Sequence, residues 1–262
     1  MSDWVHNLPV LRMALVIFGF TYLLAVAIFA FVAALATGER TKSFKAISPG
    51  MLPVLGILFG LFVAFTAAQV WSDNDRAGAA VSREASALRA AVLLAAGLPA
   101  EQEARLRGLV RGYIEQTVKA EWPDMARQTA SLKASPPALA EALQLVVEMT
   151  PQGPGQQTAQ REIIAALQSA LDARRQRIIV SQAEVNPVKW WCLYLQAICE
   201  LLVIAAVHCD NRLASAIAMG LFATGVAASV LLIAAHDRPF TGQISISPEP
   251  LLQIMPVASA SQ

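Results

Sequence analysis

The chain has 262 residues, 56% of them hydrophobic, and a formal net charge of +1. An apolar fraction this high is unusual for a soluble domain and indicates membrane insertion, while the near-neutral charge gives no general attraction to nucleic acid. The three cysteines, Cys192, Cys199 and Cys209, lie in or beside one apolar run and provide no disulfide framework.

The first apolar run covers residues 10–37 and is interrupted only by Arg12 near its start. At about 1.5 Å per residue, a helix of this length crosses a roughly 30 Å hydrocarbon core with some tilt. Ala34-Leu-Ala36 resembles a signal-cleavage site, so a signal peptide is the alternative. The run is much longer than a signal-peptide core, and a second run follows soon after, so we predict a retained transmembrane helix.

The second apolar run, residues 51–71, carries no formal charge. The chain turns polar at residues 72–76, but no glycine–proline pair stops the helix there. Apolar residues then recur at helical spacing, at Val81, Ala85, Leu88, Val92 and Ala95. We therefore predict one helix that leaves the bilayer and continues as the first helix of a soluble domain.

Two rows of side chains share neighbouring faces of this second run. Gly56, Gly60 and Ala64 form a row of small residues that lets another helix approach closely. Beside it lies a row of large apolar residues, Ile57, Leu61 and Phe65. One interpretation is ordinary helix packing with aliphatic side chains facing lipid. The other is a narrow hydrophobic constriction around a pore, which gates by losing its water.

Residues 73–187 hold most of the charge and show helical periodicity without a run of alternating strand pattern. Two further apolar runs follow at residues 190–207 and 213–235, and residues 236–262 are too broken to form another span. We predict an all-α protein with four transmembrane helices and a helical extramembrane domain inserted between the second and third spans.

Four spans place both chain ends on the same side of the membrane as the extramembrane domain. The short loops on the opposite side carry Arg40, Lys42, Lys45 and Arg212, against Arg12 and Arg238 on the short flanks of the domain side. Because positive loops stay in the cytoplasm, this pattern favours a non-cytoplasmic domain.

Catalytic signatures are absent from the sequence: it has no glycine-rich phosphate loop, no GxSxG, no HExxH and no CxxC. We therefore predict that the protein is not an enzyme and has no cofactor. His208, Cys209 and Asp210 stand together, but such a cluster is more often a polar helix cap than a metal site, and no metal is predicted.

Glu200 lies well inside the third apolar run, where a charge is costly unless it faces protein, water or a partner. Two interpretations remain open: a protonated carboxyl group hydrogen-bonded between helices, or a group facing a water-filled path. Gln196, Thr224 and Thr66 are the candidate partners. Gln69 and Thr66 are polar residues of the second run. Together with Glu200 they are the candidate intramembrane polar residues.

Five stretches carry a resemblance to a known family. They are Val81–Leu88 with Arg83 and Glu84, Leu106–Tyr113, Glu121–Pro123, Arg174–Ile178, and His236–Gly242 with Asp237, Arg238 and Pro239. In this order, over residues 50–255, the chain resembles a bacterial membrane-protein family described as bestrophin-like and of unassigned function.

Bestrophins proper are anion channels, and the second run also resembles their pore-lining helix. The resemblance implies a hydrophobic neck at Ile57, Leu61 and Phe65. The sequence has Ala64 where a glycine usually precedes the neck phenylalanine, and it lacks the acidic calcium clasp of animal bestrophins, so calcium control is not implied. Bestrophins place their soluble part in the cytoplasm, opposite to the charge pattern above.

The leading hypothesis is a homo-oligomeric channel of the bacterial inner membrane that passes small inorganic ions, with anions favoured. Its partners would be the lipid bilayer, copies of itself and those ions, with no nucleic acid. The alternative is a membrane-anchored scaffold or sensor whose helical domain binds a protein partner.

Overall fold

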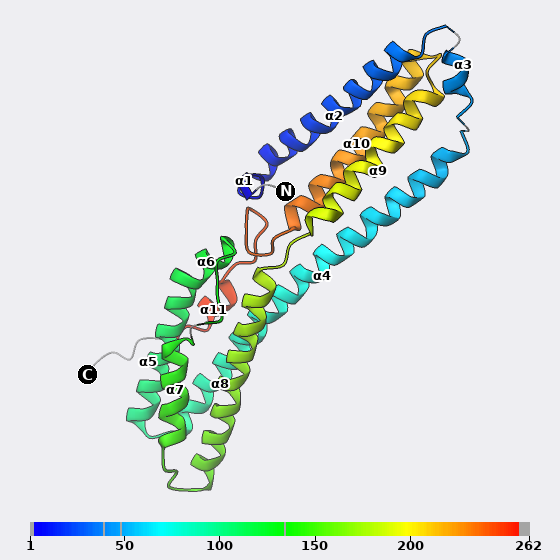
Figure 1. The fold of residues 1–262 in the computed structure, drawn as a ribbon. Helices are drawn as coiled ribbons and strands as arrows, with labels where there is room; N and C mark the ends of the chain where they lie inside the picture. Colours follow the sequence, from blue (N-terminus) through cyan, green and yellow to red (C-terminus); the bar gives the residue numbers. More distant parts are fainter. Residues whose placement is uncertain (1–2, 39, 48, 134, 257–262) are drawn as a thin grey trace. The chain divides into compact units, whose positions relative to one another are not determined.

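The structure is a computed structural model that describes residues 3–38, 40–47, 49–133 and 135–256. Over these residues it is helical and contains no strand (Figure 1). The α-helices in chain order are α1 (Asp3–His6), α2 (Val10–Leu35), α3 (Arg40–Lys45), α4 (Met51–Leu94), α5 (Ala100–Gln116), α6 (Trp122–Ala126), α7 (Pro137–Glu148), α8 (Pro154–Ser181), α9 (Pro187–Val207), α10 (Arg212–His236) and α11 (Glu249–Gln253). A 3₁₀ turn (Ala95–Gly97) follows α4, and a π-helical turn (Thr117–Glu121) joins α5 to α6.

Among the residues that the structure describes, four helices are long and apolar enough to cross a membrane: α2, α4, α9 and α10. They match the four apolar runs of the sequence, and the predicted all-α class is confirmed. The predicted continuation of the second run is also present, because α4 extends without a break for 44 residues.

Helix starts follow the local chemistry of the sequence. Pro187 is the first residue of α9, where its missing N–H leaves no hydrogen bond unmade. The side-chain oxygen of Asn186 accepts a hydrogen bond from the Val188 amide at 2.8 Å, and Asn211 does the same for the Ala214 amide at 3.0 Å ahead of α10. These caps satisfy amide groups that the first helical turn leaves free.

The chain divides into two compact units, which are described separately. The membrane unit comprises Met1–Ser72, Glu184–Arg238 and Gly242–Ile244, and the extramembrane unit comprises Asp73–Ala183, Pro239–Thr241 and Ser245–Gln262. The tail expected at residues 236–262 thus contributes to both units.

In the membrane unit, α2, α9 and α10 pack against one another. The buried face of α2 repeats every third or fourth residue, as a single helical stripe does: Met13, Ile17, Thr21, Ala25, Ile28 and Val32. The membrane half of α4 joins this core through Phe59, Ala67 and Val70, which cluster with residues of α9 and α10.

The core of the extramembrane unit is formed by the second half of α4 with α5, α7 and α8. Leu88, Leu106, Leu139 and Leu167 are fully buried in it. The short helix α11 adds Leu251, also fully buried, to the same core. The end of the chain therefore completes the packing of this unit.

Candidate functional site

The large apolar row predicted on the second run lies on the outer face of α4. Ile57, Leu61 and Phe65 are 69%, 51% and 69% exposed, respectively. The opposite face of the same helix buries Phe59, Ala67 and Val70. The three large side chains therefore do not pack inside this chain, and they are available to a ring of neighbouring copies or to lipid.

The small-residue row lies beside them. A methyl group added at Gly60 would meet no atom within 4 Å, and Ala64 is exposed, so neither packs closely against a helix of this chain. Gly56 differs, because a Cβ there would lie 3.7 Å from Glu200 Oε1 on α9. The Glu200 side chain thus lies beside Gly56 at a distance where an added methyl group would make ordinary van der Waals contact, whereas Gly60 and Ala64 leave space on the outer face.

The intramembrane polar residues have distinct surroundings. Gln69 Oε1 accepts a hydrogen bond from Lys189 Nζ at the start of α9. Thr66 is buried and donates to the Phe62 carbonyl of its own helix at 2.8 Å. Thr224 likewise donates to the Gly220 carbonyl at 2.7 Å, and its oxygen also contacts the Tyr22 hydroxyl at 2.8 Å.

Glu200 is buried, and its Oε2 has no hydrogen-bond partner among the described residues. Gln196 lies one turn earlier on α9. Its buried side-chain oxygen likewise has no hydrogen-bond partner among the described residues. Neither Thr66 nor Thr224 bonds to Glu200, so the structure contains none of the three pairings that the sequence suggested. An unpartnered carboxyl group at this depth costs free energy.

Outside the membrane helices, four of the five resemblance-bearing stretches meet in one buried cluster of the extramembrane unit. Glu84 of α4 receives two hydrogen bonds from Arg177 of α8, Nε to Oε2 at 2.7 Å and Nη2 to Oε1 at 3.1 Å. Tyr113 of α5 donates its hydroxyl to Glu84 as well. Both Glu84 and Arg177 are fully buried.

Glu121, at the end of the π-helical turn, closes the cluster. It accepts from Arg177 Nη2 at 3.0 Å and from Arg174 Nη2 at 2.6 Å. Trp122 lies under the guanidinium of Arg177, with 5.1 Å from Cζ to the ring centroid. Two arginines thus face two glutamates, and the buried charges balance.

The electrostatics hold these groups in fixed protonation states. Burial alone would lower the pKa of Arg177, but the charge and hydrogen bonds of Glu84 and the charge of Glu121 raise it above its ordinary value. Burial, followed by the nearby charge of Glu84, raises the pKa of Tyr113 well above its usual range. Arg177 therefore stays charged and Tyr113 stays neutral, as donors to Glu84 must. The Glu84–Arg177 pair is inaccessible to solvent and fixes the extramembrane half of α4 against α8.

The last stretch, His236–Gly242, serves both units. In the membrane unit, Asp237 accepts from the Val185 amide at 2.6 Å and contacts His6 Nε2 at 3.0 Å, and Arg238 bonds Glu184 at 2.9 Å. In the extramembrane unit, the Pro239 carbonyl accepts from the Ile246 amide at 2.9 Å. The Phe240 ring packs edge-on against Trp122, with 5.5 Å between the ring centroids.

Arg83, the remaining motif residue, is exposed and donates to the Ala79 carbonyl of its own helix at 3.2 Å. No group of three or more His, Cys, Asp or Glu side chains with metal-binding geometry occurs among the described residues. His208 Nδ1 lies 3.0 Å from the Ile204 carbonyl at the end of α9.

Sequence reasoning missed several of these partners. His6 was not singled out, and it is 231 residues from Asp237, so no local pattern links the two. Arg177 and Glu121 were within the resemblance-bearing stretches, but their pairing with Glu84 depends on how α4, α5 and α8 pack. The proline at position 123 was the available signal that the helix is irregular near Glu121.

Comparisons with known proteins show the family and the fold. A family model described as a bestrophin-like domain matches residues 19–251. Two solved variants of a bacterial bestrophin homolog from Klebsiella pneumoniae share the fold. The first has a TM-score of 0.70 at 16% identity, and the match covers 91% of this chain and 97% of that one. The second has a TM-score of 0.67 at 14% identity, and the match covers 91% of this chain and 96% of that one. A structure described as a membrane protein gives a TM-score of 0.67 at 14% identity, covering 90% of this chain and 98% of its own. A search of curated protein sequences finds no match.

The buried cluster makes a testable prediction about stability. Arg177→Met leaves the buried Glu84 and the partly buried Glu121 facing one arginine, so we expect it to cost about 3–5 kcal/mol of unfolding free energy. Glu84→Leu combined with Arg177→Met leaves the Arg174–Glu121 pair balanced, and we expect the double variant to be more stable than Arg177→Met alone. Unfolding midpoints of the purified proteins measure both effects.

The matched control is Arg105→Met. Arg105 bonds Glu141 at 2.8 Å, but both side chains are exposed, so this change should cost less than about 1 kcal/mol. Equal losses for Arg105→Met and Arg177→Met would contradict a special role for the buried cluster.

Proposed function

The chain belongs to the bestrophin-like family, and from that premise we propose that it forms a homo-oligomeric channel for small anions in the bacterial inner membrane. The observation that carries this proposal is the row of Ile57, Leu61 and Phe65. These large apolar side chains lie on the outer face of the membrane half of α4, which has no formal charge. In bestrophins, as the resemblance implies, the corresponding helix lines the pore.

A pore neck requires several copies of α4 around one axis, since each chain supplies a single such helix. The space beside Gly60 and the exposed Ala64 support this assembly, because small side chains allow the helices of neighbouring copies to approach closely. The three large residues then stack on successive turns along the axis. A ring of them excludes water, and ions face a large dehydration cost at the neck.

The fixed position of α4 supports the same function. A neck opens and closes by small changes in its radius, so the helix that bears it needs a rigid attachment. The bidentate bond between Glu84 and Arg177 attaches the extramembrane half of α4 to α8. In this proposal that attachment steadies the extramembrane half of α4.

Glu200 is a second element of the proposal. The structure keeps its carboxyl group buried in the membrane unit without a partner among the described residues, at a cost in stability. Intramembrane acids retained at such a cost are functional candidates. We propose that Glu200 influences ion passage from its position against Gly56 of α4.

The first prediction from this proposal concerns assembly. Gly60→Leu fills the open space on the outer face of α4, so we expect it to weaken the oligomer. Because a Cβ at Gly60 meets no atom of this chain, the fold of the single chain should survive the change. Light scattering of the detergent-extracted protein measures the effect, and a wild-type protein that is monomeric at every concentration would contradict the oligomer.

The second prediction concerns the neck. Phe65→Ala widens the ring and removes apolar surface, so we expect anion flux in reconstituted vesicles to rise by about tenfold, which corresponds to a barrier lowered by ~1.4 kcal/mol. Stability should change little, because the side chain is exposed within the chain.

Two control variants isolate the neck. Phe31→Ala removes a ring of α2 that is 60% exposed, against 69% for Phe65, and Phe62→Ala removes a ring of α4 that packs against the core of the membrane unit. Neither should raise the flux. Vesicles that remain as tight as empty ones with both wild type and Phe65→Ala would favour the scaffold or sensor instead.

The third prediction concerns Glu200→Gln. The amide has the same shape as the carboxyl group but does not titrate, so we expect a folded protein whose flux loses part of its pH response or changes its ion selectivity. Flux at several pH values and a thermal unfolding midpoint measure this. A lower midpoint with unchanged flux would assign Glu200 to helix packing alone.

A further inference from the structure

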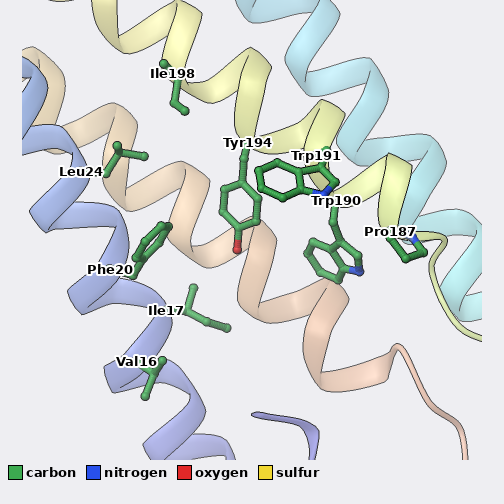
Figure 2. Close-up of a pocket in the computed structure, with 9 residues that line it drawn as sticks. All are labelled: Val16, Ile17, Phe20, Leu24, Pro187, Trp190, Trp191, Tyr194 and Ile198. Atoms are coloured by element: carbon green, nitrogen blue, oxygen red, sulfur yellow. The ribbon is translucent and has the colours of Figure 1, made fainter. Parts of the chain in front are cut away.

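An apolar groove of about 450 Å³ runs between α2 and α9 in the membrane unit (Figure 2). This volume lies within the range of roughly 300–1,000 Å³ that is typical of ligand sites. The lining contains aliphatic and aromatic side chains and proline, and its one side-chain hydroxyl belongs to Tyr194. No charged side chain lines it.

The groove has a floor and raised edges. Ile17 of α2 and Trp190 of α9 form the floor, and each is only 5% exposed. Phe20 and Trp191 form the edges and are 55% and 76% exposed. Figure 2 shows Phe20 and Leu24 of α2 projecting toward the helix that carries Tyr194. The groove is therefore a cleft between α2 and α9. The side chains at its edges keep this cleft open.

The length of the groove along α9 is close to the thickness of one membrane leaflet. Its lining begins at Pro187, the first residue of α9, and reaches Ile198, a rise of roughly 16 Å at 1.5 Å per residue. Half of a bilayer core of roughly 30 Å is of similar length. On α2 the lining begins at Val16, near the start of that helix.

Both helices start at the same end of the membrane unit. Asp237 ties the two entry segments together, since it contacts His6 ahead of α2 and accepts from the Val185 amide ahead of α9. The groove therefore runs from one membrane surface to about the middle of the bilayer.

We propose that this groove binds one acyl chain of a membrane phospholipid, with the lipid headgroup at the end near Pro187. A single flexible hydrocarbon chain matches the apolar lining and a length close to that of one leaflet. Water in such a groove would leave the apolar walls hydrated, which is unfavourable. The aromatic edge residue Trp191 lies at the headgroup end, where indole rings are preferred.

A second copy of this chain is the competing occupant, and the edges of the groove argue against it. Large exposed side chains such as Phe20 and Trp191 hold a neighbouring helix away, whereas close helix pairs in membranes rely on small residues. A lipid chain is thin enough to enter between them. The bound lipid would therefore bridge α2 and α9 independently of any pore.

The test uses the full chain reconstituted in vesicles of phosphatidylethanolamine and phosphatidylglycerol that carry a photoactivatable group on the acyl chain. Crosslinking followed by peptide mapping should place the label on groove residues such as Phe20 and Tyr194. After exchange into mild detergent, about one phospholipid per chain should remain bound in native mass spectra.

Leu24→Trp fills the groove, and Leu23→Trp makes the same change at the adjacent residue, which is exposed and outside the groove. We expect Leu24→Trp to reduce the retained lipid and the groove crosslinks by about tenfold, equivalent to ~1.4 kcal/mol. Leu23→Trp should leave both unchanged, and equal unfolding midpoints would show that both variants fold.

Three results would overturn the proposal. Crosslinks spread evenly over all exposed membrane residues would mean that the groove holds only bulk lipid. Equal lipid retention by Leu23→Trp and Leu24→Trp would place the bound lipid elsewhere. A Leu24→Trp protein that keeps its lipid but falls apart into monomers would assign the groove to a second copy of the chain.

Discussion

The structure of the extramembrane unit depends on one buried charge arrangement, in which Arg177 of α8 is enclosed by Glu84 and Glu121. A guanidinium removed from water is tolerated only when its hydrogen bonds are met, and here its Nε and Nη2 groups donate to carboxylates while Nη1 contacts Met125 Sδ. Hydrophobic packing alone would let helices slide or rotate. A planar bidentate pair restricts both, since its two parallel bonds fit one orientation. The long helix α4 therefore has a defined rotation within this unit.

That rotation matters because α4 must satisfy two different environments. Its membrane half has no formal charge, and its extramembrane half carries Glu84 on a face that is completely buried. The helix is continuous along both halves, and the Glu84–Arg177 pair fixes the rotation of its extramembrane half within the extramembrane unit. The π-helical turn at Thr117–Glu121 contributes to this fixation, because an extra residue in a turn shifts the side chains that follow, and Glu121 then bonds both arginines.

The sequence predicts what depends on local pattern. The apolar runs give the four long membrane helices, and the spacing of Val81, Leu88 and Val92 gives the continuation of α4, because helical periodicity is a property of neighbouring residues. Pairings between distant residues have no such signal. Glu84 and Arg177 are 93 residues apart, and His6 and Asp237 are 231 apart, so their contacts follow from the assembled fold. For Glu200 the sequence offered three polar partners at plausible depths, yet its near neighbour in the structure is the backbone of Gly56. No local pattern links Glu200 to Gly56, because the two residues lie on α9 and α4 and meet only in the assembled fold.

Two of the outer apolar surfaces of the membrane unit differ at their edges, and this difference bears on what covers each. Beside Ile57, Leu61 and Phe65 stand Gly60 and Ala64, whose small size lets another helix approach. Beside the groove stand Phe20 and Trp191, whose bulk keeps another helix at a distance while leaving a cleft for something thinner. Hydrophobicity alone does not distinguish the two surfaces, because lipid tails are as apolar as leucine and can cover either one. Shape separates them: the first suits further copies of the chain around a common axis, and the second suits a lipid chain.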